Sequence, residues 1–148
     1  MTNDTRDRSD RDVMAPARRP MILVIDDQPQ ILALYSRALS TAGYQTEVAG
    51  SAEAALARIR KTPPDAILVD LKMPYINGMG LLYRLREFQP DMPVAVLTGA
   101  SNVDDRTIRE VEALHAALHF KPLSNRDLLH VAGNLVGASL PGRDACVL

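Results

Sequence analysis

The chain has 148 residues, 47% of them hydrophobic and 24% charged, and its formal net charge is −1. This length and hydrophobic content fit one globular domain with its own core. The balanced charge excludes a general attraction for nucleic acid or for an anionic membrane surface. Only 4% of the residues are aromatic, which disfavours a stacking surface for single-stranded nucleic acid. No apolar run approaches the roughly 20 residues needed to span a bilayer.

The two ends of the chain show little sign of regular structure. Residues 1–20 alternate Arg and Asp with Thr, Ser and Pro, which predicts a disordered arm without the apolar segment of a secretion signal. Residues 137–148 contain Gly and Pro, and we expect a flexible tail. The single cysteine, Cys146, excludes an internal disulfide and fits a reducing compartment. We therefore predict a cytoplasmic protein with one domain over residues 21–136.

Strand and helix patterns alternate along this domain. Apolar runs predict strands at residues 21–25, 65–69, 93–98 and 118–121, and residues 44–49 alternate enough for a strand at or near a sheet edge. A helical pattern of apolar residues follows each strand. We expect these helices over residues 31–42 before Gly43, from Ser51 to Pro63, from Met79 to about Pro90, from Asn102 to about Ala116, and after a cap at Ser124.

Five strand–helix units of this kind predict the fold. Fully apolar strands joined by helical crossovers form parallel sheets that are covered on both faces. Five such units fit an α/β, flavodoxin-like (βα)5 doubly wound sheet with strand order 2-1-3-4-5. The strand order of that sheet reverses between the first and third strands, and ligands bind at such a point.

Polar side chains stand where four of the predicted strands end. Asp26 and Asp27 follow the first strand, Asp70 follows the third, Thr98 ends the fourth and Lys121 ends the fifth. Since the C-terminal ends of parallel strands share one edge of the sheet, we expect these groups to gather in one crevice. Three carboxylates, a hydroxyl and an ammonium are the donors that a divalent cation and a phosphoryl group require.

The carboxylates favour Mg²⁺, a hard cation that takes one or two carboxylates together with water and phosphate oxygens. Asp26, Asp27 and Asp70 would repel one another without a counter-ion. An Asp pair after a strand can instead cap the next helix. Taken alone, the pair fits either interpretation, but Asp70 on the neighbouring strand favours the metal.

Asp70 also has the properties of a nucleophile. A carboxylate can accept a phosphoryl group and form an aspartyl phosphate. Pro74 and Gly78 predict a tight loop that holds this carboxylate toward the crevice. Lys121 would neutralise phosphoryl oxygens, and the Pro122 that follows it is a candidate for a cis peptide bond.

These residues resemble the CheY-like receiver domains of bacterial two-component response regulators. The resemblance covers residues 21–136 and is carried by residues in the expected order: Asp26-Asp27, Asp70 with Lys72-Met73-Pro74 and Gly78, Thr98-Gly99-Ala100, and Lys121-Pro122. It implies that Asp70 accepts the phosphoryl group from a phosphohistidine on a sensor histidine kinase or phosphotransfer protein. It also implies Mg²⁺ as cofactor, bound by Asp27 directly, by Asp26 through water, by Asp70 and by the Lys72 backbone carbonyl. Such a protein catalyses only its own phosphorylation and dephosphorylation, so we do not expect an enzyme.

The resemblance further implies a switching role for Thr98 and a phosphate-pairing role for Lys121. Receivers of this kind usually carry Tyr or Phe three residues before the lysine, where this chain has Leu118. His119 and Phe120 are adjacent but are expected on other faces or off register. We therefore expect phosphorylation to be retained and the coupling of threonine to an aromatic side chain to be changed.

The output is predicted to be a protein contact. After Pro122 only 148 − 122 = 26 residues remain, too few for a helix-turn-helix module with its basic face. We expect a stand-alone receiver that binds neither nucleic acid nor membrane and signals through the surface over residues 102–136. The main alternative is a phosphate sink or phosphorelay intermediate without a dedicated target.

Two alternatives of another class have weaker support. A flavodoxin-like electron carrier needs a phosphate-cradling loop after the first strand, whereas Asp26-Asp27-Gln28-Pro29 would repel a flavin phosphate. A haloacid-dehalogenase-type phosphatase needs a second Asp two residues after the nucleophile, where this chain has Lys72. A transition-metal site is not expected, because the histidines share no ligand spacing; they are His115, His119 and His130.

Overall fold

The apolar runs form one parallel sheet. The computed structural model describes residues 18–73, 76–99 and 103–139. The strands pair in the order β2-β1-β3-β4-β5, and every pairing is parallel. They are β1 (Met21–Ile25), β2 (Gln45–Ala49), β3 (Ala66–Asp70), β4 (Val94–Thr98) and β5 (Ala117–Phe120). The predicted flavodoxin-like topology is therefore confirmed.

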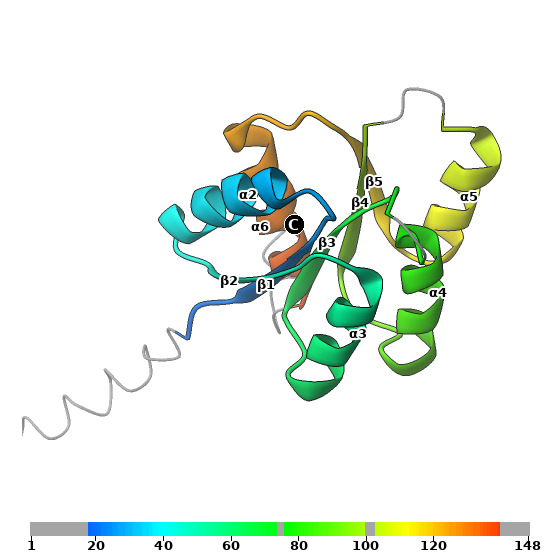
Figure 1. Ribbon diagram of the computed structural model, residues 1–148, viewed down its shortest axis with the longest axis horizontal. Coiled ribbons are helices and arrows are strands. Elements are labelled where there is room, and N and C mark those ends of the chain that lie inside the picture. Colours follow the sequence, from blue (N-terminus) through cyan, green and yellow to red (C-terminus); the bar gives the residue numbers. More distant parts are fainter. Residues whose placement is uncertain (1–17, 74–75, 100–102, 140–148) are drawn as a thin grey trace, which may run out of the picture.

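Helices cover both faces of the sheet (Figure 1). On one face lie α2 (Pro29–Thr41) and α6 (Asn125–Ser139), and on the other lie α3 (Ala52–Lys61), α4 (Gly78–Phe88) and α5 (Asp105–Ala113). Each of these helices follows a strand and packs back on the sheet, as expected for repeated βα units. Within the described residues, no helix is both long enough and apolar enough to cross a membrane.

Alternation along the central strands divides the core into two layers. Leu23 and Ile67 point into the cluster under α3, α4 and α5, whereas Val24 and Leu68 point into the cluster under α2 and α6. Every residue of β3 and β4 is buried. The outer strands β2 and β5 keep exposed positions, which confirms that residues 44–49 contribute an edge strand.

Capping residues set several helix boundaries. The hydroxyl of Ser124 accepts from the backbone N–H of Asp127, which confirms the predicted cap, and that of Ser51 accepts from Ala54 at the predicted start of α3. The predicted start of the fourth helix, Asn102, lies outside the described residues, and α5 itself begins at Asp105, where Asp104 caps it and accepts from the backbone N–H of Thr107. That helix also ends early, at Ala113. His115, two residues later, has a positive φ of 58°, a conformation that does not continue a right-handed helix.

The described elements and contacts extend slightly beyond the predicted domain. The Pro20 carbonyl accepts from the backbone N–H of Gln45, and Arg18 pairs with Asp65. At the other end, α6 continues to Ser139 instead of stopping at Val136. The rest of the predicted arm and tail, with Cys146, lies outside the described residues.

Candidate functional site

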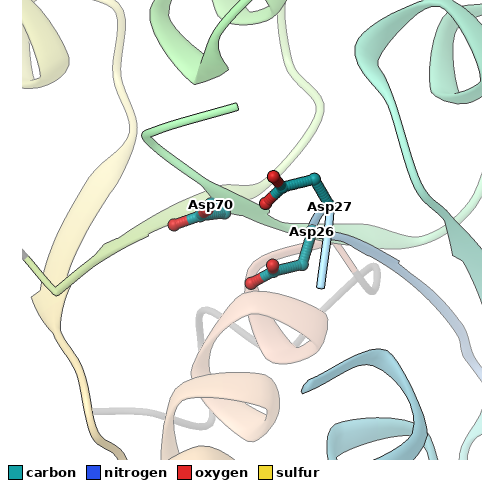
Figure 2. Close-up of side chains that lie close together, drawn as sticks. All are labelled: Asp26, Asp27 and Asp70. Atoms are coloured by element: carbon teal, nitrogen blue, oxygen red, sulfur yellow. The ribbon is translucent and has the colours of Figure 1, made fainter. Parts of the chain in front are cut away.

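Three carboxylates meet at the C-terminal edge of the sheet (Figure 2). Asp26 and Asp27 follow β1 directly, and Asp70 is the last residue of the adjacent strand β3. One oxygen of each carboxylate lies within 4.8 Å of the others. Asp26 and Asp70 are only 3% and 7% exposed, while Asp27 is open to solvent. The structure thus brings together the three carboxylates that the sequence singled out.

The Asp pair does not cap the helix that follows it. The cap position of α2 belongs to Gln28, whose side chain makes no capping hydrogen bond. Asp26 Oδ1 instead accepts from the backbone N–H of Gln28 at 2.9 Å, a local turn that aspartate forms readily. This turn holds the Asp26 carboxylate at the strand end. The helix-cap alternative for the pair is therefore wrong.

Lys121 reaches the cluster from β5. Its Nζ lies 3.2 Å from Asp26 Oδ2 and 3.2 Å from Asp70 Oδ1. Its backbone N–H donates to the carbonyl of Thr98 at 2.7 Å, which extends the β4–β5 pairing to this residue. The Lys121–Pro122 peptide bond is cis, as predicted. One ammonium therefore bridges carboxylates from two different strands.

The charges in this cluster do not balance. Burial raises the pKa of the Asp70 carboxyl above its usual range, and the Asp26 carboxylate raises it further, against the lowering effect of Lys121. Burial by itself would lower the pKa of Lys121, but the Asp70 and Asp26 carboxylates outweigh it, and the pKa of the ammonium is raised. Lys121 therefore stays charged, and it directly contacts two of the three carboxylates, Asp26 and Asp70.

The donor set fits a magnesium ion. Oxygen ligands within 4.8 Å of one another and an excess of negative charge are the features that a hard divalent cation requires. Asp27 leaves its carboxylate open to solvent, so that side of the cluster is accessible. Among the residues that the structure describes, no other group of three His, Cys, Asp or Glu side chains has this arrangement.

A cleft of about 540 Å³ opens beside the carboxylates. Its polar lining consists of Gln28, Tyr35, Lys72 and Lys121, of which Lys72 is exposed. The remaining lining is largely apolar: Ile31, Leu34, Gly99, Pro122 and Leu123. Such a cleft can admit a side chain of a partner to the neighbourhood of Asp70.

Thr98 is fully buried at the end of β4. Its partner in the next strand is Phe120, which is 51% exposed. Leu118 is half-buried against the core cluster under α3, α4 and α5, and by strand alternation Phe120 shares its face. His119 lies on the opposite face, as expected, but Phe120 does not. The register partner of Thr98 is therefore aromatic, and this ring lies two positions after the one where receivers usually carry an aromatic residue.

Sequence reasoning missed Tyr35, a buried residue of α2 in the wall of the cleft. Burial raises the pKa of its hydroxyl, the nearby Lys121 ammonium opposes this rise, and the hydroxyl interacts with the Leu123 backbone. Its apolar spacing on a helix indicated only a core position. Pro74 and Ala100, which contributed to the sequence resemblance, lie outside the described residues.

Comparisons with known proteins agree with this geometry. Residues 22–132 match the family described as response regulator receiver domain. The chain is 39% identical over 87 residues to the transcriptional regulatory protein PrrA of Mycobacterium leprae, covering 59% of this chain and 37% of that protein. It is 32% identical over 124 residues to the response regulator MprA of Mycobacterium avium, covering 84% and 54%. The chain thus spans roughly a third to a half of the length of these relatives.

Solved structures show the same fold. The chemotaxis protein CheY4 of Vibrio cholerae superposes with a TM-score of 0.71 at 27% identity, covering 79% of this chain and 98% of that one. A CheY-like receiver domain protein of Methanospirillum hungatei gives a TM-score of 0.76 at 27% identity, covering 82% and 96%. Together with the family match over residues 22–132, these structures favour a receiver domain over the flavodoxin-like carrier and the haloacid-dehalogenase-type phosphatase.

Proposed function

The chain belongs to the response regulator receiver domain family, a regulatory family of two-component systems, and from this premise we propose that Asp70 is its phosphoacceptor. The phosphoryl donor is a phosphohistidine on a sensor histidine kinase or a phosphotransfer protein. The observation that carries the proposal is the position of the Asp70 carboxylate, paired with Lys121 and joined by Asp26 and Asp27.

The proposed reaction is a displacement at phosphorus. A carboxylate oxygen of Asp70 attacks the phosphorus atom of the phosphohistidine, the P–N bond breaks, and the imidazole leaves with its electron pair. Lys121, 3.2 Å from Asp70 Oδ1, pairs with the oxygens of the transferred group. Lys121 also pairs with Asp26. After the transfer, its ammonium therefore interacts with the phosphoryl group as well as with the two carboxylates.

Magnesium binding is part of the proposal. The ligands are Asp26, Asp27, Asp70 and the backbone carbonyl of Lys72. Held by these residues, Mg²⁺ would supply positive charge to the phosphoryl oxygens and to the excess of carboxylates. The chain's own contribution is to keep these groups in place before the donor arrives, which lowers the barrier by positioning.

The output is proposed to be a protein contact on the face formed by α5, β5 and α6, which includes Phe120 and lies next to the buried Thr98. The half-exposed ring of Phe120, the register partner of the buried Thr98, is a surface feature that a partner can bind. Some relatives are named as transcriptional regulatory proteins, and the chain spans only part of their length. A stand-alone form, a cytoplasmic location and the absence of nucleic-acid binding therefore stay predictions. A phosphate sink remains the alternative.

Incubation with a small phosphodonor and Mg²⁺ tests the proposal. We expect one acid-stable, base-labile phosphoryl group per chain, detected by intact mass. Asp70→Asn is expected to abolish it, because the nucleophilic oxygen is replaced by an amide. The matched variant Asp65→Asn changes the carboxylate at the other end of β3 and should be labelled like the wild type. Labelling that survives Asp70→Asn, or that proceeds unchanged in EDTA, would contradict the assignment.

A further inference from the structure

The first residue of α4 lies against the backbone of the proposed phosphoacceptor. A Cβ atom built on Gly78 would stand 2.5 Å from the carbonyl oxygen of Asp70 and 2.9 Å from the Cα atom of Leu71. It would also be 3.2 Å from the carbonyl carbon of Asp70. These neighbours are backbone atoms of a buried strand end, so they cannot turn away as a side chain can. Any residue other than glycine must displace the backbone of Asp70 or the start of α4.

Space is the reason for glycine at this position. The φ of Gly78 lies outside the left-handed region, since among the glycines of the described residues only Gly43 has a positive φ. Other residues can therefore adopt this backbone conformation. Alanine also favours helices over glycine by about 1 kcal/mol. The local propensity thus favours a side chain at Gly78, and only the contact with Asp70 and Leu71 forbids it.

The same contact closes the loop that leads from β3 to α4. The backbone N–H of Gly78 donates to the carbonyl of Leu71 at 2.9 Å. On the other side, the backbone N–H of Leu71 donates to the carbonyl of Leu97 in β4 at 2.8 Å. The strand end is therefore fixed from two directions, by β4 and by the first turn of α4. The loop closed in this way begins at the carbonyls of Leu71 and Lys72.

We propose that Gly78 is a positioning residue for the phosphoryl-transfer site, because its missing side chain lets α4 lie directly on the backbone of Asp70. This contact fixes the direction of the Asp70 carboxylate and the course of the loop that carries the Lys72 carbonyl. The inference rests on the proposed role of Asp70. Gly78, a residue without any functional group, thus sets the geometry for both the nucleophile and the cation.

The test compares Gly78→Ala with Gly80→Ala. The two glycines lie in the same turn of α4, but a Cβ on Gly80 would meet only side-chain atoms, Ile76 Cγ2 at 3.0 Å and Asn77 Oδ1 at 3.7 Å. Both variants are made in a Gly133→Ala background. A Cβ there meets only the Tyr44 hydroxyl at 3.8 Å, so this helical change is expected to stabilise the fold.

Two measurements are made on the folded proteins. The Mg²⁺ affinity comes from amide chemical shifts in an NMR titration, and the phosphorylation rate comes from intact mass with a small phosphodonor. We expect Gly78→Ala to weaken Mg²⁺ binding about tenfold and to slow phosphorylation about a hundredfold. Gly80→Ala should change neither by more than about twofold, because flexible side chains can absorb its Cβ.

The amide shifts also distinguish this inference from the function on which it rests. Before Mg²⁺ is added, the amides of Asp70 and Leu71 should shift in Gly78→Ala and not in Gly80→Ala. A wild-type chain that is not phosphorylated would overturn the role of Asp70 and leave these comparisons of shift and affinity intact. The inference is overturned if Gly78→Ala retains the amide shifts, Mg²⁺ affinity and rate of its background. Equal losses in both variants would overturn it as well.

Discussion

The two ends of β3 carry the same residue type in opposite circumstances. Asp65 precedes the strand at the amino edge of the sheet, and Asp70 ends it at the carboxyl edge. Asp65 accepts from the backbone N–H of Met21 at 2.8 Å and pairs with Arg18, whose side chain is 62% exposed. Asp70 pairs with Lys121, whose side chain is 16% exposed, and faces two further carboxylates.

This difference separates a structural carboxylate from the proposed phosphoacceptor. At Asp65 the local charges balance, and its hydrogen bond tethers the start of β1. At Asp70, burial and the Asp26 carboxylate oppose ionisation. Electrostatic repulsion therefore destabilises the folded state at this edge of the sheet. A bound cation relieves repulsion of this kind.

The largest difference between the two edges is expected for the loss of the cationic partner. Lys121→Met keeps much of the side-chain volume but leaves Asp26 and Asp70 without their ammonium. We expect the free energy of unfolding in EDTA at neutral pH to fall by about 3 kcal/mol, the lower end of the range for broken buried ion pairs. Arg18→Met, at the exposed pair, should cost less than about 1 kcal/mol. Urea denaturation measures both, and equal losses would remove the distinction.

Magnesium should stabilise only the carboxyl edge. A ligand that binds the folded state alone adds about 2.7 kcal/mol at a hundred times its dissociation constant. We expect the melting temperature of the wild type to rise with Mg²⁺ and that of Asp27→Asn to rise much less at the same concentration. Asp65→Asn should respond like the wild type. Thermal unfolding at several Mg²⁺ concentrations checks this, and an undiminished response of Asp27→Asn would contradict the proposed ligand set.

The smallest effect concerns pH in the absence of metal. Because the pKa of Asp70 is raised in the folded state, the folded chain binds its proton more tightly than the unfolded chain. The stabilisation that this tighter proton binding gives the folded state is fully present below roughly pH 4, and it is lost as the pH rises through the raised pKa. Asp70→Asn removes this loss, so in EDTA at neutral pH it should be more stable than the wild type. Asp65→Asn should be less stable, because it loses an ion pair. Denaturation curves between pH 4 and pH 8 show whether each variant is more or less stable than the wild type.

Much of the fold was predictable because its signals are local. A continuous apolar run predicted β1 with its observed bounds, Met21–Ile25. The carboxylate cluster followed from one rule, that parallel strands end at a common edge. Helix ends were harder to predict: residues 102–104 include more than one possible cap, and the choice of Asp104 does not follow from local propensity.

By itself, then, the sequence determined the order of elements, the two-layer core, and which carboxylates share an edge with Lys121. Tertiary structure alone decided that Lys121 bridges Asp26 and Asp70 equally, at 3.2 Å each. It also decided that Phe120 is opposite Thr98, and that Gly78 is needed for space instead of for its flexibility. The physical reason is the distance along the chain over which each interaction acts. Periodicity and capping act over a few neighbouring residues, whereas these distances depend on how strands and helices far apart in the chain pack together.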